Sequence, residues 1–135
     1  MNILRILWVG VLAGMAFVVL DALAHVNPLA QRLYAAYRPI MRPSVNAPLG
    51  VAFDILFGIV MASIFAMLLP ALPAHWALRG LAFGLLVWIF RSAMNAASQL
   101  VMFQIPASTT IYMLLSSLFE MLLLAFLYAL LLKPR

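Results

Sequence analysis

The residues of this chain that could do chemistry are few, and they lie within strongly apolar segments. Five are ionisable: Asp21, His25, Asp54, Arg91 and Glu120. An ionisable side chain inside a membrane span is costly, tends to face the interior of a helix bundle, and marks a functional site by default. A carboxylate there can bind a cation or take a proton, and an arginine can bind an anion or keep a nearby carboxylate ionised.

Helical spacing places these residues on shared faces with other polar side chains. Asp21 and His25 are four residues apart, so both lie on one face of a helix. Arg91, Asn95 and Gln99 follow one another at the same interval and form a polar stripe. Packing such stripes toward one another predicts a polar pocket. Its expected lining is Asp21, His25, Asp54, Arg91, Asn95, Gln99 and Glu120.

The two deepest charges are Arg91 and Glu120. Counted along a helix, Arg91 lies roughly 20 Å from either end of its segment and Glu120 about 14 Å below the start of its own. Ser116 and Ser117 share a helix face with Glu120. We therefore expect an Arg91–Glu120 ion pair at the base of the pocket. The expected mouth, on the side of a long loop, carries Asp21, His25 and Asp54.

The same ion pair also has a purely structural interpretation, in which it fixes the register of the bundle. Polar contacts between helices average only ~0.6 kcal/mol in one membrane protein. Removing one partner of a buried pair costs about 3–5 kcal/mol. Arg91 should therefore matter for folding under either interpretation. One acid would be enough to pair with Arg91 and fix the register, but the chain has three acids in its apolar segments. A functional pocket therefore stays open as the competing interpretation.

Four apolar segments must position these residues. Hydrophobic residues make up 68% of the 135-residue chain and charged residues 8%, whereas a soluble domain is roughly half apolar and a quarter charged. The composition excludes a lone soluble globule and a disordered chain. A membrane-spanning helix needs about 20 mostly apolar residues. The segments that qualify are 3–23, 50–69, 76–103 and 111–132.

The expected fold is an all-α integral membrane protein, with one four-helix transmembrane domain over residues 1–135. Helices are expected because lipid cannot satisfy the polar groups of an open strand edge. The connections 70–75 and 104–110 are short, and short connections make antiparallel neighbours. The sequence therefore predicts four antiparallel spanning helices.

The first connection, residues 24–49, is long and carries basic and aromatic residues. Asn27 followed by Pro28 is a typical helix start, because Asn caps the helix and Pro fits its first turn. We expect a short helix near residues 28–37 at the membrane interface, where arginine and tyrosine are favoured. An interfacial anchor is favoured over a recognition element. Its residues are Arg32, Tyr34, Tyr37, Arg38 and Arg42.

The net charge of +5 indicates a membrane surface rather than nucleic acid, because excess Lys and Arg match anionic lipid headgroups. We expect the lipid bilayer as a partner. Four positive charges lie on the side of the termini and three on the side of the long loop. The positive-inside rule therefore places both termini in the cytoplasm, in an inner or plasma membrane, by one charge, and dual topology stays open. The charges compared are Arg5, Arg79, Lys133 and Arg135 against Arg32, Arg38 and Arg42.

The sequence also predicts a two-fold internal repeat of two-helix units. A shift of 74 residues aligns the first segment with the third and places Gly10 on Gly84. A shift of 66 residues aligns the second segment with the fourth and places Asp54 on Glu120. Successive helix pairs of this kind would be parallel repeats, related by an axis along the membrane normal. Chance similarity between apolar helices is the alternative.

Three classes of function remain, and the favoured one is not enzymatic. The polar pocket predicts binding or translocation of a small polar ligand or ion, and transport would need a homo-oligomer because one small bundle encloses little volume. The first alternative is a non-catalytic accessory subunit of a larger membrane complex. The second is an intramembrane enzyme acting on a lipid or peptide, with Asp21 and Asp54 as an acid dyad.

The sequence specifies no cofactor. It has no cysteine and no phosphate-binding or metalloprotease motif. Asp21 and His25 would need a third ligand, such as Asp54, to hold a metal ion. We therefore assign no metal ligand and no catalytic residue.

Overall fold

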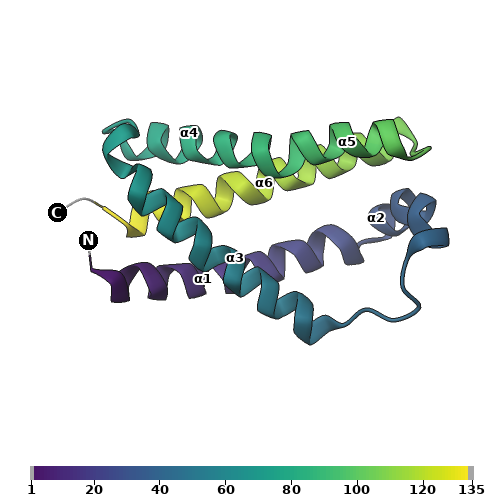
Figure 1. Ribbon diagram of the computed structural model, residues 1–135, viewed down its shortest axis with the longest axis horizontal. Helices are drawn as coiled ribbons and strands as arrows, with labels where there is room; N and C mark the ends of the chain where they lie inside the picture. The colour runs from purple at the N-terminus through teal and green to yellow at the C-terminus, as the bar shows by residue number, and fades with distance from the viewer. Residues whose placement is uncertain (1, 134–135) are drawn as a thin grey trace.

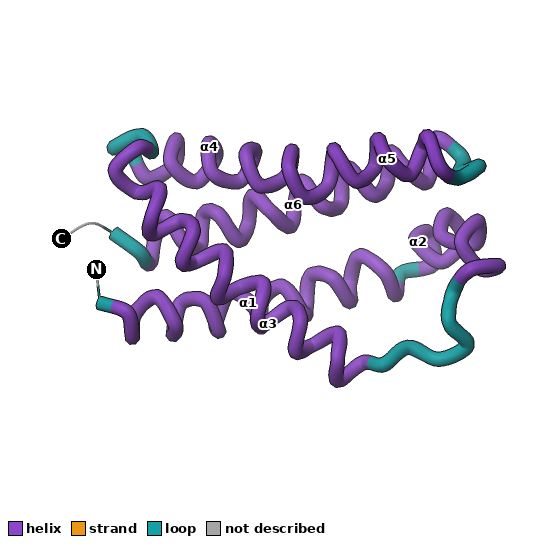
Figure 2. The backbone as a smooth tube through the Cα atoms, viewed as in Figure 1, coloured by secondary structure: helices purple, strands orange, loops and turns teal. Residues whose placement is uncertain are grey.

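The computed structural model describes residues 2–133, which form helices joined by loops and contain no strand (Figure 2). Four helical segments in this range are long and apolar enough to cross a membrane. The all-α, four-helix membrane fold expected from the sequence is therefore confirmed. The segments are Ile3–Val26, Ala47–Ala71, Trp76–Met102 and Ala107–Leu131.

The first segment is one helix, α1 (Ile3–Val26). The second is α3 (Ala47–Leu68), which ends in a 3-10 turn. The third consists of α4 (Trp76–Trp88), a π-helical stretch (Ile89–Ala93) and α5 (Met94–Met102). The fourth is α6 (Ala107–Leu131). The long loop holds the expected short helix as α2 (Pro28–Leu33), continued by a 3-10 helix (Tyr34–Ile40).

Capping explains where the helices around the long loop begin. The Asn27 side chain accepts a hydrogen bond from the Ala30 N–H at 2.8 Å and starts α2, as its sequence position predicts. Asn46 accepts from the Leu49 N–H at 3.2 Å, so α3 begins at Ala47 and not at residue 50. Hydropathy missed this turn because it counts apolar residues and ignores the cap.

α6 also begins earlier than expected, at Ala107 instead of residue 111. Its first turn contains two threonines that we had placed in a loop. Thr109 is buried, and its hydroxyl donates a hydrogen bond to the Leu33 carbonyl at 2.7 Å. This contact fastens the long loop to α6 and holds the first turn in place.

The four spanning segments are antiparallel in chain order (Figure 1). α1 and α4–α5 run in one direction, and α3 and α6 run in the other. The start of α1 and the end of α6 lie at one end of the bundle, which we call the termini end, and α2 with the long loop lies at the opposite end, which we call the loop end (Figure 1). Arg135, one of the charges counted for orientation, lies outside the described residues.

The helices pack as two hairpins, and glycines bring the first pair together. α1 packs mainly against α3 and α4 mainly against α6. A Cβ atom built on Gly58 of α3 would lie 2.4 Å from the Gly10 carbonyl oxygen and 2.4 Å from the Gly14 nitrogen on α1. Backbone therefore meets backbone at this crossing, as small residues permit between membrane helices.

The second hairpin repeats part of this packing. In the first hairpin the nearest atom to a Cβ built on Gly10 belongs to Ile59, and in the second a Cβ built on Gly84 would contact Leu122 and Ala125. The shifts of 74 and 66 residues carry Gly10 onto Gly84 and Ile59 onto Ala125. The Gly84–Ala125 contact therefore occupies the position that the proposed repeat assigns to the Gly10–Ile59 contact. The internal repeat itself stays a prediction.

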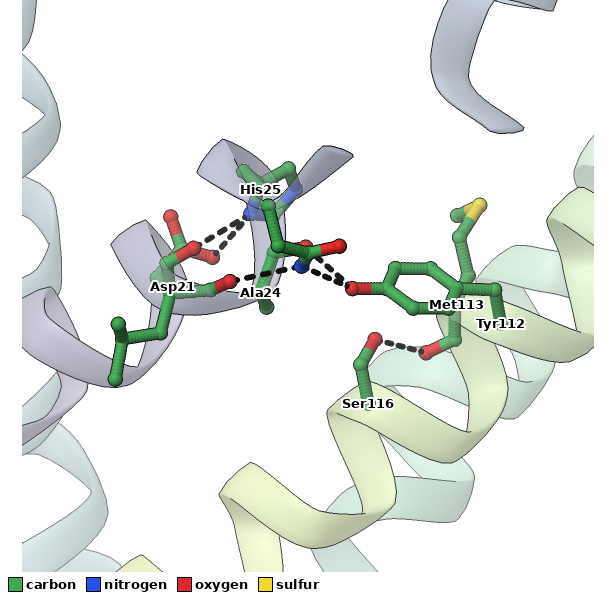
Figure 3. Close-up of polar contacts among 8 residues, drawn as sticks. Asp21, Ala24, His25, Tyr112, Met113 and Ser116 are labelled. Carbon is green, nitrogen blue, oxygen red and sulfur yellow. Dashed lines mark hydrogen bonds and ion pairs between the residues drawn. The ribbon is translucent and has the colours of Figure 1, made fainter. Parts of the chain in front are cut away.

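The two hairpins meet along the seam between α1 and α6. At the termini end, Arg5 donates to the Leu131 carbonyl at 2.5 Å. At the loop end, the Tyr112 hydroxyl donates to the Ala24 carbonyl at 2.7 Å (Figure 3). α3 and α4–α5, in contrast, diverge from their short connection toward the loop end (Figure 1).

The apolar core fills the termini half of the bundle. Phe65 of α3 packs edge-on against Phe83 of α4, with ring centroids 5.0 Å apart, and both rings are fully buried. Tyr128 of α6 lies against both rings and donates a hydrogen bond to the Gly58 carbonyl at 3.0 Å. The termini half is therefore tightly packed. Its buried Arg79 donates hydrogen bonds to the Pro73 and Ala74 carbonyls of the adjacent loop, whereas Glu120 lies in the loop half.

Candidate functional site: a polar pocket at the loop end

A pocket of about 230 Å³ opens in the loop half of the bundle, between α1, the 3-10 helix, the π-helical stretch, α5 and α6. Of the seven residues expected to line it, five do: Asp21, His25, Arg91, Asn95 and Glu120. Ser116 and Ser117, which share a face with Glu120, complete the α6 wall. We call this cavity the polar pocket. Its other lining residues are Tyr34, Ser92, Ala96, Met113 and Leu114.

Glu120 is the most buried acid of the polar pocket. Its side chain lies on α6 and is only 5% exposed. Within residues 2–133 its carboxyl forms no side-chain hydrogen bond and no ion pair within 4.0 Å, and its oxygens are open to the cavity rather than enclosed. A buried carboxyl pays a large desolvation cost unless something pairs with it. The carboxyl of Glu120 is thus available to a ligand, an ion or a proton that enters the pocket.

Arg91 lies in the π-helical stretch that interrupts the third segment. Such a π-bulge is uncommon and is found frequently at functional sites, because the extra residue per turn changes the direction of the side chains that follow. No glycine or proline marks the stretch in the sequence. Sequence reasoning therefore treated this segment as one regular helix and missed the bulge.

The expected Arg91–Glu120 ion pair is not formed in the described chain. The Arg91 guanidinium instead lies over two aromatic rings, 4.5 Å from the centroid of Phe57 and 4.9 Å from that of Phe17. Cation–π contact of this kind contributes about 0.5–1 kcal/mol at an exposed site, and the Arg91 side chain is exposed. The spacing of polar residues predicted which face of the helix carries Arg91 but not what Arg91 contacts. Periodicity within one helix cannot reveal aromatic rings that α1 and α3 contribute.

Asp21 and His25 form the mouth of the polar pocket on α1. His25 Nδ1 lies 3.3 Å from a carboxylate oxygen of Asp21 and 2.8 Å from the Asp21 backbone carbonyl (Figure 3). Both side chains are well exposed. The imidazole ring also stacks on Tyr34, with centroids 5.1 Å apart. The pair is therefore held in a fixed position at the rim.

Tyr34, which the sequence assigned only to the interfacial anchor, also lines the polar pocket. Its ring contacts His25 and packs edge-on against Tyr112, at 5.9 Å between centroids. Burial, reinforced by the neighbouring Tyr112, raises the pKa of Tyr34 to about 12. Tyr34 therefore presents a neutral phenol to the pocket. Tyr34 follows Asp21 by 13 residues and His25 by 9, and it gave no signal in a helical pattern because the chain turns at Asn27.

Gln99, which the sequence places in the expected lining, does not line the polar pocket in the structure. Its side-chain oxygen accepts a hydrogen bond from the Tyr37 hydroxyl, so the amide is engaged by the loop. Tyr37 also contacts the sulfur of Met113. The other expected anchor residues, Arg32, Arg38 and Arg42, are exposed at the loop end. The interfacial position of this loop stays a prediction.

Asp54 is separated from the polar pocket and lies in a second cavity, on the side of the bundle where α3 and α4–α5 diverge. This cavity, which we call the lateral hollow, has a volume of about 340 Å³ and is mainly apolar. Arg91 lines it as well as the polar pocket. The expected mouth therefore holds one acid, Asp21, whereas an Asp21–Asp54 dyad would need both. The lining of the lateral hollow is Phe17, Phe53, Asp54, Leu56, Phe57, Val60 and Arg91.

Metal binding by Asp21, His25 and Asp54 gains no geometric support. Among the described residues, no three His, Asp or Glu side chains come close enough to hold a metal ion. No protein-family model, curated protein or solved structure matches this chain. What the polar pocket does must therefore be inferred from its own residues.

Proposed function

We propose that this membrane protein binds a small cation, or a small polar molecule that carries a cationic group, in the polar pocket. The observation that carries the proposal is the buried Glu120 carboxyl, which faces the cavity without a partner in the described chain. Asn95 and the two serines of α6 add neutral hydrogen-bonding groups. A cation supplies the one interaction that this arrangement lacks.

The charges around the polar pocket favour a cation over an anion. Asp21 and Glu120 are two carboxyls, and Arg91 is the one guanidinium among the lining residues. Arg91 is engaged by the rings of Phe17 and Phe57, so it does not neutralise Glu120 by direct contact. In a medium of low dielectric, an uncompensated carboxylate attracts a cation strongly. The pocket is too small for a bulky ligand and suits a small one.

Thermal unfolding in detergent, with and without added ions, tests this proposal. We expect ethylammonium to raise the melting temperature in a concentration-dependent way, because a ligand that binds only the folded state stabilises it by mass action. Acetate at the same ionic strength should have no such effect. The stabilisation should disappear in Glu120→Gln and persist in Asp54→Asn, an acid outside the polar pocket.

The structural interpretation of the same residues gives a different result. If Glu120→Gln and Arg91→Ala both unfold the protein in detergent, the two side chains serve folding. A folded Glu120→Gln variant that responds to ethylammonium like the wild type contradicts the proposal. An accessory-subunit role would appear instead as a protein that is not monodisperse without its partners. For the enzymatic alternative, Asp21 and Asp54 line neighbouring cavities that share Arg91.

Translocation would require more than one copy of the chain. Below the polar pocket the bundle is closed by the fully buried side chains of Phe65, Phe83 and Tyr128. A route through the membrane would therefore run between subunits of a homo-oligomer. Cross-linking of the reconstituted protein, with ethylammonium flux measured in the same vesicles, separates transport from binding alone.

We further propose that both termini lie in the cytoplasm and the polar pocket opens on the opposite side. The support is the one-charge excess at the termini end. The chain has no cysteine, so Val45→Cys introduces a single label site on the long loop, where Val45 is 81% exposed. An impermeant maleimide should label this cysteine from outside intact cells. Labelling only after the cells are opened reverses the orientation.

A further inference from the structure

We propose that the ligand is a single-chain amphiphile, with its cationic group in the polar pocket and its apolar part in the lateral hollow. This inference rests on the proposed function, and it adds the class of ligand and its route. The lateral hollow lies inside the membrane-spanning part of the bundle, between α1, α3 and the π-helical stretch. An amphiphile dissolved in the leaflet at the loop end would reach it from the side.

The first support is the open seam of the bundle. The seam between α1 and α6 is closed at both ends by hydrogen bonds from Arg5 and Tyr112. The corresponding seam between α3 and α4–α5 is closed at the termini end by Phe65 against Phe83, and the two helices diverge toward the loop end (Figure 1). Phe53, which lines the lateral hollow at this seam, is 59% exposed. An apolar chain in the bilayer therefore has direct access.

The second support is Arg91, which lines both cavities. Its guanidinium lies over the rings of Phe17 and Phe57, which line the lateral hollow. Cation–π contact holds this side chain without a salt bridge in the described chain. A modest movement of the Arg91 side chain would join the two cavities into one site.

The third support is the match between the two cavities and one molecule. The lateral hollow is lined mostly by phenyl and aliphatic side chains, which suit an alkyl or aryl group. Asp54 lies at its wall, and Asp21 and Glu120 lie in the polar pocket, so acids outnumber Arg91 along the whole path. This balance selects a cationic head. The volume of about 340 Å³ suits one chain rather than the two chains of a bilayer lipid.

Photo-cross-linking of the reconstituted full chain tests the inference. The probe is octylammonium with a diazirine at the end of its alkyl chain. We expect the probe to label the α3 peptide that contains residues 53–60, and ethylammonium to compete with this labelling because it occupies the same head site. Labelling spread evenly over the exposed faces of the helices contradicts the inference.

The internal repeat offers a matched pair of variants. Phe53 and Phe119 are related by the shift of 66 residues and are almost equally exposed, at 59% and 61%, but Phe119 does not line the lateral hollow. Phe53→Ala should raise the concentration of octylammonium needed for half-maximal labelling about three- to tenfold, the value of one aromatic contact. Phe119→Ala should leave it unchanged. Equal effects of the two variants contradict the inference.

The outcomes separate this inference from the proposed function. If ethylammonium stabilises the protein through Glu120 but octylammonium does not label residues 53–60, the polar pocket binds small cations. The proposal that the ligand is an amphiphile is then wrong. If neither amine acts through Glu120, both proposals fall. In the last experiment, octylammonium labelling is repeated in phosphatidylcholine vesicles with added phosphatidylethanolamine. Competition by phosphatidylethanolamine would make a bilayer lipid the ligand and overturn the single-chain assignment.

Discussion

At the scale of single residues, the chemistry of the site depends on which charges find partners inside the protein. Asp21 is paired with His25, and Arg91 is held by two aromatic rings. Glu120 has neither kind of partner in the described chain, although it is 5% exposed. Burying a carboxyl without a partner destabilises the fold. The proposed binding of a cation rests on this unpaired carboxyl.

Sequence reasoning located most of these residues but not their partners. The intervals of four residues placed Asp21, His25, Arg91 and Asn95 correctly at one pocket. They also placed Gln99 there, whereas the Tyr37 hydroxyl engages it. Periodicity assigns a side chain to a face of its own helix. It cannot show which loop or aromatic ring from another element reaches that face first.

A residue-scale prediction concerns the buried hydroxyl of Tyr128. This hydroxyl donates to the Gly58 carbonyl and joins α6 to α3. Tyr128→Phe should lower the free energy of unfolding by about 0.5–1.5 kcal/mol, the net value of one hydrogen bond. Unfolding in mixed micelles with increasing dodecyl sulfate measures the change. Tyr34→Phe is the control, since the structure shows no hydrogen bond from the Tyr34 hydroxyl within residues 2–133; an equal loss there would refute the assignment.

At the scale of elements, the four spanning segments were predictable, and their interruptions and ends were not. Hydropathy identified all four because each contains enough apolar residues to cross a bilayer. It missed the early starts of α3 and α6, which depend on Asn46 and on Thr109. It also missed the π-helical stretch at Arg91, since no glycine or proline marks that stretch in the sequence.

An element-scale prediction concerns the crossing of α1 and α3. A Cβ atom at Gly58 would lie 2.4 Å from backbone atoms of Gly10 and Gly14, and backbone cannot turn aside as a side chain can. Gly58→Ala should therefore force the helices apart and cost about 1–3 kcal/mol of unfolding free energy. Gly50→Ala is the matched control on the same helix, because a Cβ there meets nothing within 4 Å.

The control should be neutral or gain up to about 1 kcal/mol, since alanine favours a helix more than glycine does. Dodecyl sulfate titration of both variants gives the comparison. Similar stabilities for Gly58→Ala and Gly50→Ala would show that α1 and α3 do not cross as closely as the structure shows.

At the scale of the whole molecule, two hairpins share one seam and leave the other open. The closed seam and the apolar core make the termini half dense, and the polar residues gather where the helices diverge. The sequence predicted this division between halves, because the deep charges all lie toward the long loop. It could not predict that α1 and α6 stay together while α3 and α5 diverge, since an internal repeat implies that the two hairpins meet in the same way on both sides.

The most direct test of the central claim is the accessibility of the polar pocket to charged reagents in a bilayer. The chain has no cysteine, so Ser117→Cys adds one thiol to the pocket wall, and Leu115→Cys adds one at a position 62% exposed on the outer face of the same helix. The measurement is the rate of modification by a cationic and an anionic methanethiosulfonate, each divided by its rate with a free thiol.

We expect Ser117→Cys to react with the cationic reagent about tenfold faster than with the anionic one, because an unpaired carboxylate raises the local concentration of cations. Adding Glu120→Gln should remove most of this preference, and Leu115→Cys, facing lipid, should react with neither reagent. Equal rates for the two reagents at Ser117→Cys, or no reaction there, would contradict a cation-binding polar pocket.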